Sequence, residues 1–333
     1  MSNKFKNIII ICGIIVIAAA LIIHFSTAKD HNHSLTISLP QTPNIGLILL
    51  AQKKGLFQAH QLNLRLDYKD TGKEALETLY AGKSDLAIAF ETPIALGIAT
   101  RKNIKIITEL HRSFRNTALL YRTDRFEPNS LGMIDLRGKR VGVIEDTNAE
   151  FFLNLYLMAS SHKNKANIIY LTSDSLKEQM RNGQLDALAW WEPHLSELYA
   201  QSDGKLEYSK TEFYTELSAL VCLEQTCQNK KAAILKLMRA LKEAELFLEQ
   251  QPDTGHKLIL SYFSDNNLNS DHFNLSEIYL QLGLSSVLTS ILEIQLGWFQ
   301  QKKINAQATS IDLIPYYEPY FLNKVAPLTV TFE

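Results

Sequence analysis

Cysteine is scarce in this chain: three of its 333 residues are cysteines, which excludes a small fold built on disulfide bonds. The 14 glycines and 9 prolines are too few for a collagen-like or low-complexity protein. No run of five basic residues occurs, and 34 Lys and Arg residues face 35 Asp and Glu residues, so a nucleic-acid groove is not expected. With 46% hydrophobic residues, a chain of this length predicts a compact protein of two lobes.

The N-terminal residues 1–28 have the three parts of an export signal. Lys4 and Lys6 precede an uncharged apolar run at 8–23, and a small residue follows at Ala28. The run is shorter than the roughly 20 residues that span a bilayer, which favours cleavage after Ala28 over a retained membrane anchor. Residues 29–34 would then be a polar linker, and the remaining chain is expected in the periplasm or otherwise outside the cytoplasm.

After this segment, short apolar runs alternate with amphipathic stretches, which is typical of β-α units and a largely parallel sheet. The pattern occurs twice, with strands predicted at 35–39, 62–68, 86–90 and 104–110, and then at 140–144, 168–171 and 185–190. We therefore predict an α/β protein with two doubly wound lobes. A long helical stretch at 230–251 is expected to lie on the side of the first lobe.

The two halves also correspond in sequence. Residues 82–89 align with residues 183–190, an offset of 101 (183 minus 82), and each segment has a glycine followed by an aspartate that opens a strand. Each strand is followed by an aromatic residue and a glutamate, Phe90-Glu91 and Trp191-Glu192. Ligands of open α/β sheets bind at the carboxyl ends of strands, so both pairs are predicted to face one cleft. Chance remains the alternative explanation of so short a match.

Six short motifs together resemble the substrate-binding proteins of ABC importers, in particular the NMT1/SsuA-like group that binds nitrate, sulfonates, taurine and pyrimidine precursors. In chain order the motifs are Lys54-Gly55-Leu56-Phe57, Thr71-Gly72, the segment 81–87, Thr92-Pro93, the segment 135–143 and Trp191-Glu192-Pro193. The resemblance extends over residues 35–262. Each motif is weak alone, but their shared order is specific.

The resemblance implies a type II periplasmic-binding-protein fold, in which two crossing segments join the lobes. The crossings are expected near 118–122 and 217–223, which gives a first lobe of 35–119 plus 220–333 and a second lobe of 120–219. It also implies a monomer that needs no cofactor or metal, is not an enzyme, and passes a small-molecule ligand to an ABC permease in the inner membrane.

Polar residues at the expected strand ends and helix starts are the candidate ligand-binding residues. They are Thr42, Asn44, Thr71, Gly72, Glu91, Thr92, Arg112, Thr147, Asn148, Trp191 and Glu192. Backbone N–H groups at helix starts bind anionic or carbonyl oxygens, although Thr71, Thr147 and Asn148 are equally explained as helix N-caps. Arg112 could bind an acidic end of a ligand or form a local salt bridge.

Trp191 and Glu192 are the strongest candidates, since an indole offers a flat wall and a carboxylate accepts N–H donors. The alternatives are packing of Trp191 at the lobe boundary and capping of the next helix by Glu192. Two glutamates, Glu91 and Glu192, in one cleft would disfavour a bare anion such as nitrate, because like charges repel where water is excluded. We therefore expect a ligand with a cationic or N–H-rich part, such as a zwitterion or a pyrimidine-like heterocycle.

Cys222 and Cys227 are the cysteines that remain after cleavage, and an oxidising compartment favours a disulfide between them. The alternative is a buried Cys222 and an unpaired Cys227. His31 and His33 in the linker resemble a metal pair only superficially, so no metal site is predicted.

Two other functions remain open from the sequence. One is a membrane-tethered sensor of the same fold, which a retained helix at 8–23 would favour. The other is an enzyme like the pyrimidine-precursor synthases of the same superfamily, whose cysteine-rich metal motif the two cysteines do not match. The segment Gly82-Lys83-Ser84 imitates a phosphate loop, but Glu77 stands where that loop needs a glycine.

Overall fold

The computed structural model describes residues 33–160, 165–209, 214–266, 268, 275–302 and 311–332. The predicted export signal or anchor at 1–28 and His31 lie outside these ranges. Within the ranges, no helix combines the length and the apolar composition that crossing a membrane requires.

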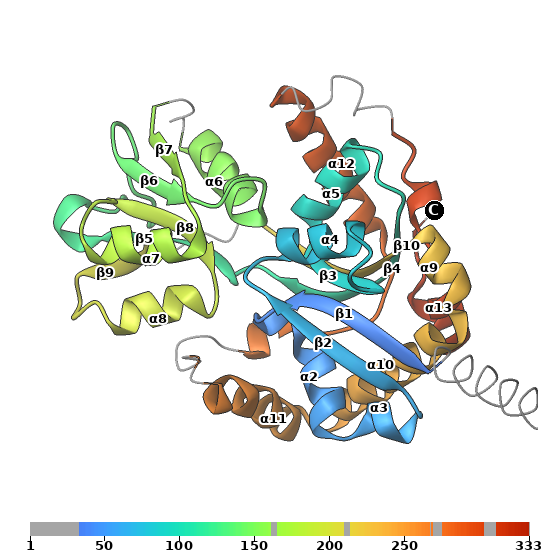
Figure 1. The fold of residues 1–333 in the computed structure, drawn as a ribbon. Helices are drawn as coiled ribbons and strands as arrows, with labels where there is room; N and C mark the ends of the chain where they lie inside the picture. Colours follow the sequence, from blue (N-terminus) through green and yellow to red (C-terminus); the bar gives the residue numbers. More distant parts are fainter. Residues whose placement is uncertain are drawn as a thin grey trace, which may run out of the picture.

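Two separate sheets form the two lobes (Figure 1). The first sheet has the order β11-β4-β10-β3-β1-β2 and the second the order β7-β6-β8-β5-β9. The first contains β1 (Ser34–Pro40), β2 (Asn63–Lys69), β3 (Leu86–Phe90), β4 (Ile104–Ser113), β10 (Glu216–Leu223) and β11 (Ile278–Tyr279). The second contains β5 (Thr117–Arg122), β6 (Arg140–Val143), β7 (Asn167–Tyr170), β8 (Ala187–Trp191) and β9 (Leu206–Ser209). The predicted two-lobed α/β architecture is confirmed.

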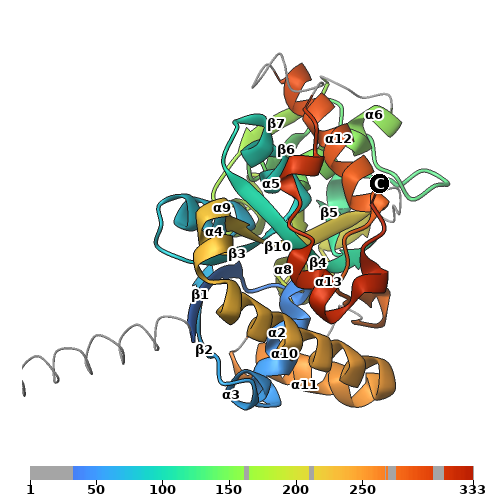
Figure 2. The same ribbon diagram turned by 90° about the vertical axis from the view of Figure 1, so that its right-hand side faces the viewer.

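Helices surround both sheets. Those of the first lobe are α2 (Gly46–Lys53), α3 (Leu56–Ala59), α4 (Gly72–Tyr80), α5 (Glu91–Ala99), α9 (Glu224–Asn229), α10 (Lys231–Gln250), α11 (Pro252–Asp265), α12 (Ser286–Gln301) and α13 (Tyr320–Val325). Those of the second are α6 (Asn148–Ala159), α7 (Ser173–Arg181) and α8 (His194–Ala200). The short 3-10 helices are η1 (Pro43–Ile45), η2 (Thr123–Arg125), η3 (Leu275–Glu277), η5 (Ile314–Tyr316) and η6 (Pro327–Thr329). As predicted, α10 lies on the side of the first lobe, next to α2 and α11 (Figure 2).

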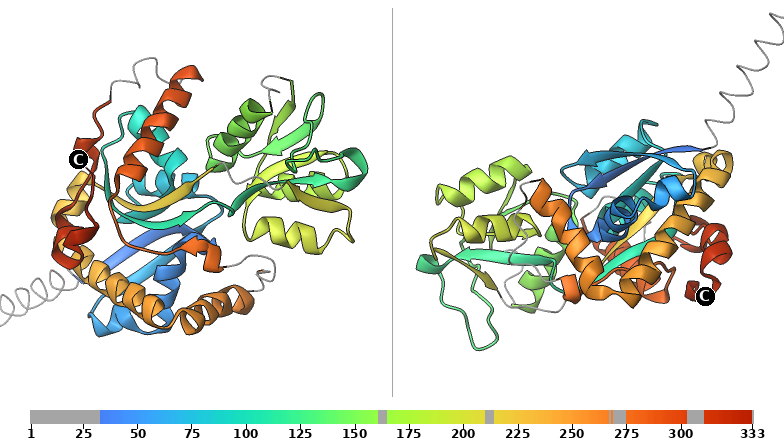
Figure 3. Two further views of the ribbon diagram at one scale, coloured as in Figure 1. Left: turned by 180° about the vertical axis from the view of Figure 1, so that it is seen from behind. Right: turned by 90° about the horizontal axis from the view of Figure 1, so that it is seen from below.

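The chain passes between the lobes twice. It leaves the first sheet after Ser113 and enters the second at Thr117, and it returns between Ser209 and Glu216 (Figure 3). The segments 118–122 and 217–223, where crossings were expected, lie inside β5 and β10, and each of these strands pairs within one sheet. The change of sheet therefore falls a few residues before the expected lobe limits, because an apolar pattern identifies a strand but not its partner.

Local sequence explains how the strand ends are fixed. Gly82 and Gly183 adopt positive φ angles of 68° and 69°, which end the helices before β3 and β8. Thr71 accepts a hydrogen bond from the backbone N–H of Glu74 (3.1 Å) and caps α4, an interaction worth about 1 kcal/mol. At Gly72 a side chain would approach the Cα of Ala89 to 3.0 Å, so glycine allows α4 to pack directly against β3.

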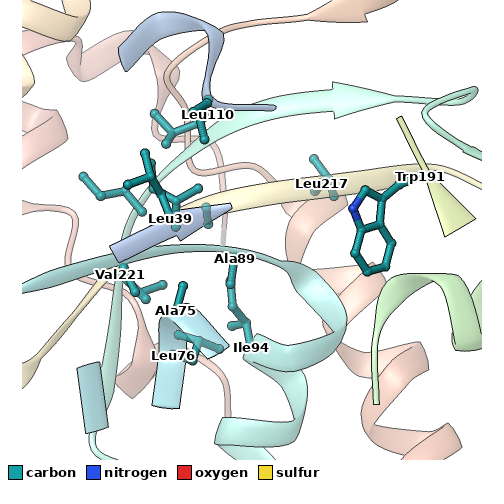
Figure 4. Close-up of a cluster of buried hydrophobic side chains, with 14 of the residues drawn as sticks. Leu39, Ala75, Leu76, Ala89, Ile94, Leu110, Trp191, Leu217 and Val221 are labelled. Carbon is teal, nitrogen blue, oxygen red and sulfur yellow. The ribbon is translucent and has the colours of Figure 1, made fainter. Parts of the chain in front are cut away.

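The core of the first lobe extends to the lobe boundary. Leu39, Ala89 and Val221 are fully buried in the central strands, and Figure 4 shows Trp191 of the second lobe beside Leu217 at the edge of this cluster. β3 and β8 are buried along their whole lengths, as expected for strands covered by helices on both faces. A disulfide joins Cys222 to Cys227, with Cα atoms 6.0 Å apart, and links the end of β10 to α9.

Candidate ligand-binding site

The two aromatic residues that follow the matched strands come together. Phe90 ends β3 in the first lobe and Trp191 ends β8 in the second, and their ring centroids are 6.5 Å apart. Both side chains are buried, with 3% and 2% of their surface exposed. The carboxyl ends of strands from both lobes therefore meet at this boundary, where ligands of such folds bind.

Glu91 does not project freely into a cleft. Its carboxylate accepts hydrogen bonds from the Tyr214 hydroxyl, the Leu217 backbone N–H (2.9 Å) and the Gln295 side-chain amide (3.1 Å). The residue is fully buried at the start of α5, and this burial raises the pKa of Glu91 to about 7, although its hydrogen bonds act in the opposite direction. Glu91 thus connects α5 to the returning chain and to α12.

Glu192 is bound mainly within its own lobe. Its carboxylate accepts hydrogen bonds from the Ser196 backbone N–H (3.0 Å) and the Tyr208 hydroxyl (3.4 Å), and the residue is 5% exposed. The capping of α8, which the sequence left open as an alternative, is therefore present. These contacts occupy both carboxylate oxygens.

Another buried glutamate at the boundary, Glu216, was not predicted from the sequence. Its carboxyl group interacts electrostatically with that of Glu91. The side chain of Glu216, the first residue of β10, accepts hydrogen bonds from the Thr117 hydroxyl and from Asn148 Nδ2 (3.2 Å). Asn148 begins α6, so this contact joins the lobes. Burial, with a smaller contribution from the charge of Glu91, raises the pKa of Glu216 to about 8. The sequence signal that could have identified Glu216 is its position at the start of the apolar run of β10.

His111 is the second residue that the sequence analysis missed. It lies in β4 and is fully buried, and its Nε2 atom is 3.9 Å from Oε1 of Glu216. Burial lowers the pKa of His111 to about 3, so its imidazole is neutral at physiological pH. Its ring also meets the Phe90 ring edge to face, with centroids 5.9 Å apart.

The remaining candidate residues Thr42, Asn44, Thr92 and Thr147 are all buried. Thr42 donates a hydrogen bond to Asn44, and Thr147 donates to the Ile144 carbonyl (2.7 Å) rather than capping α6 with its side chain. Asn44 Nδ2 and Thr92 Oγ1 have no hydrogen-bond partner among the described residues.

Arg112 forms the local salt bridge that the sequence left open as its alternative role. Its guanidinium donates to Glu109 (3.1 Å) and to Ser285 (3.2 Å). In the sheet Arg112 stands opposite Leu217, whereas His111 stands opposite Ser218, so the arginine lies on the other face of the sheet. The structure does not bring Arg112 together with Glu216 and Trp191.

Ion pairs cross the boundary at its rim. Lys73 of α4 lies 3.3 Å from Asp146, and Lys302, which follows α12, lies 3.1 Å from Asp146 and 2.9 Å from Glu150. An apolar groove of about 450 Å³ lies nearby, between α6 and α12, with Tyr214 and Thr215 among its lining residues. In the described part of the chain, no group of three or more His, Cys, Asp or Glu side chains could hold a metal ion.

Two α/β lobes, joined by two crossings and meeting at their strand ends, define the type II periplasmic-binding-protein fold. The chain belongs to the NMT1/THI5-like family, which matches residues 42–255. Its fold is also that of the SsuA-like periplasmic binding proteins, as its motifs predict.

Three known proteins illustrate these similarities. The alkanesulfonate-binding protein SsuA from Xanthomonas axonopodis pv. citri, solved with bound MOPS, has a TM-score of 0.70 at 18% identity, over 86% of this chain and 98% of that one. A Brucella abortus (strain 2308) protein named "Putative binding protein" is 21% identical over 225 residues, or 66% of this chain and 68% of its own length. A Haemophilus influenzae protein named "Putative thiamine biosynthesis protein" is 24% identical over 236 residues, 68% of this chain and 72% of its own length.

Proposed function

We propose that this protein is the extracytoplasmic solute-binding component of an ABC importer. It captures a small polar molecule containing nitrogen or sulfur between its lobes and delivers it to a permease in the inner membrane. It acts as a monomer and catalyses no reaction. The family and the fold support this role, and the lobe boundary supplies the observation on which it rests.

That observation is a set of buried polar atoms, drawn from both lobes, that lack hydrogen-bond partners among the residues described. The first lobe contributes Asn44 Nδ2 and Thr92 Oγ1, and the second contributes the indole Nε1 of Trp191. A buried donor or acceptor without a partner costs about 1–3 kcal/mol, so such groups are rare unless something else pairs with them. A ligand held between the lobes would supply the missing partners.

Capture in this fold is a closing motion. The chain changes sheet between Ser113 and Thr117 and again between Ser209 and Glu216, so a rotation of one lobe against the other would part Phe90 from Trp191. A ligand stabilises the closed form by as much as it prefers that form over the open one. Affinity and the open-to-closed equilibrium are therefore linked.

The hydrogen-bonding groups at the boundary indicate the ligand class. The Xanthomonas relative of the fold binds an alkanesulfonate, and the Haemophilus relative is named for thiamine biosynthesis. In this chain two buried carboxyl groups, Glu91 and Glu216, lie at the boundary, while Arg112 is paired on the opposite face of the sheet. We propose a ligand that offers acceptor atoms to the unpaired donors Asn44 Nδ2 and Trp191 Nε1 and N–H groups to these carboxyl groups, such as a zwitterion or a pyrimidine-like heterocycle.

A thermal-shift screen of amines, sulfonates, amino acids and pyrimidines on the purified chain tests this function. A ligand present at 100 times its dissociation constant stabilises the native state by about 2.7 kcal/mol and raises the melting temperature accordingly. We expect at least one nitrogen-containing compound to do so. A screen in which no compound raises the melting temperature would contradict a solute-binding role.

A further inference from the structure

A buried glutamate joins the two lobes beside their second connection. Glu216 is the first residue of β10 in the first lobe and is 1% exposed. Its carboxyl group accepts hydrogen bonds from the Thr117 hydroxyl at the start of β5 and from Asn148 Nδ2 (3.2 Å) at the start of α6. Both donors belong to the second lobe, so this carboxyl group bridges the lobes.

Glu216 differs from other buried glutamates in having no cationic partner. Three of the others form salt bridges, namely the pairs Glu109–Arg112 (3.1 Å), Glu150–Lys302 (2.9 Å) and Glu245–Lys242 (2.6 Å). No Lys or Arg that the structure describes forms a salt bridge with Glu216 or with Glu91. An ionised carboxylate without a countercharge is so unfavourable in a buried place that the group takes up a proton instead.

The titratable groups that face Glu216 do not supply a positive charge. The nearest basic group is His111 of β4, whose Nε2 is 3.9 Å from Oε1 of Glu216, but burial lowers the pKa of His111 to about 3 and keeps the ring neutral. Glu91, at the start of α5, is itself acidic. In the returning connection, burial raises the pKa of Tyr214, so its hydroxyl also stays neutral.

Charged groups on the other neighbouring elements have partners of their own. They are Arg112 on the opposite face of the sheet, which pairs with Glu109, Glu150 of α6, which pairs with Lys302, and Glu192 after β8, which caps α8. Glu216 therefore lies in a neutral to acidic environment. Burial, with a smaller contribution from the charge of Glu91, accordingly raises the pKa of Glu216 from 4.5 to about 8.

Parting the lobes changes this environment. Asn148 moves away with the second lobe, and the carboxyl group of Glu216 meets water, where a glutamate ionises with a pKa near 4.5. The closed form thus holds a proton that the open form gives up to water. Because the pKa is raised in the closed form, this proton stabilises closure fully below pH 4.5, and its contribution is lost as the pH rises through about 8.

We propose that the lobes close with the uptake of one proton by Glu216, so that a rise in pH favours the open form. This inference rests on the closing motion of the proposed function and adds a means of regulating it. On closing, a proton from water binds a carboxylate oxygen, and on opening it returns to water; no other bond changes. Since one proton is released for each opening, the ratio of open to closed molecules rises by up to about tenfold for each unit of pH in this window.

Small-angle X-ray scattering of the ligand-free protein at about pH 5 and about pH 9, on either side of most of this window, tests the proposal. We expect the wild type to have the larger radius of gyration at the higher pH. The indole N–H resonance of Trp191, assigned with a Trp191→Phe variant, should shift over the same range, because opening removes its contact with Phe90. Glu216→Gln still accepts hydrogen bonds from Thr117 and Asn148 but cannot ionise, so its radius should be the same at both pH values.

Glu91→Gln is a second variant that does not alter the bridge between the lobes. It removes the negative charge that helps to raise the pKa of Glu216, so it should expand less than the wild type at the higher pH. Glu245→Gln is the matched control, because Glu245 is also buried (3% exposed) but pairs with Lys242 on α10, away from the boundary. It should expand as the wild type does.

Equal radii of the wild type at both pH values would overturn the proposal. An expansion of Glu216→Gln, or of Glu91→Gln, as large as that of the wild type would also overturn it. In each of these cases a compound that raises the melting temperature in the thermal screen would leave the solute-binding function standing. Failure of the screen as well would overturn both.

Discussion

The two matched strand ends differ in what their glutamates do. Phe90-Glu91 and Trp191-Glu192 occupy equivalent places after β3 and β8, and the aromatic residues of both pairs meet at the lobe boundary. Glu91, however, ties α5 to β10 and to α12, whereas Glu192 caps the helix that follows it. Equivalent positions in two similar lobes thus keep the shape of the boundary, while the surrounding elements decide the role of each carboxylate.

Removing an aromatic ring should have the largest effect, because both rings are almost fully buried. Trp191→Ala is expected to lower the free energy of unfolding by about 3–5 kcal/mol, the usual loss when a buried Trp or Phe becomes alanine. Phe90→Ala should lower the free energy of unfolding by a similar amount, because the Phe90 ring packs against Trp191 and His111. Urea unfolding measures both losses, and a loss below about 1 kcal/mol in either variant would show that the rings do not form one packed boundary.

Substitution of Glu91 and of Glu192 should lower the free energy of unfolding by different amounts. Glu91→Ala leaves the Tyr214 hydroxyl, the Leu217 N–H and the Gln295 amide without their acceptor, and each buried unpaired donor costs about 1–3 kcal/mol. Glu192→Ala leaves fewer donors without their acceptor, namely the Ser196 N–H, a cap worth about 1 kcal/mol, and the Tyr208 hydroxyl at 3.4 Å. We expect Glu91→Ala to be the more destabilised by urea unfolding. Equal losses would contradict the difference in role.

Glu91 should also affect the pH dependence of stability. Glu91 has a pKa raised from 4.5 to about 7 by burial, so in this window the folded state holds a proton that the unfolded state releases. Its contribution to stability is full below pH 4.5 and is lost as the pH rises through 7. Glu91→Gln should flatten this part of the curve of unfolding free energy against pH, and Glu216→Gln should do so up to about pH 8.

Glu197→Gln is the control for this experiment, because Lys177 lowers the pKa of Glu197 against the effect of burial, so the neutral part of the curve should not change. His111 acts on the acid side: its pKa is lowered from 6.5 to about 3, so stability falls as the pH drops below 6.5. A curve for Glu91→Gln that falls between pH 4.5 and 7 as steeply as the wild type would contradict the assignment.

The rim ion pairs should have the smallest effect on stability. Lys73 and Lys302 are partly exposed, and such pairs contribute on the order of 0–1 kcal/mol. Their loss should instead shift the equilibrium toward the open form. In Lys73→Ala/Lys302→Ala, small-angle scattering should give a larger radius of gyration than in wild type, whereas Lys177→Ala, which removes a pair with Glu197 inside the second lobe, should give no change. Equal radii in all three proteins would exclude a role in closure.

The sequence predicted the lobes better than the polar contacts between them. Periodicity and the order of six motifs identified the fold and brought Phe90 and Trp191 to one boundary. They could not identify the partners of Glu91, because one of these, Gln295, lies 204 residues further along the chain. Nor could they identify His111 and Glu216, since a polar residue in or beside an apolar strand does not indicate which face it occupies until the strand's neighbours are known.

A crystal structure of the protein with the compound that raises its melting temperature most would test the central claim most directly. The account predicts the compound between the lobes, in contact with Trp191 and within hydrogen-bond distance of Asn44 Nδ2. A compound bound elsewhere on either lobe, with the contact between Phe90 and Trp191 unchanged, would contradict it.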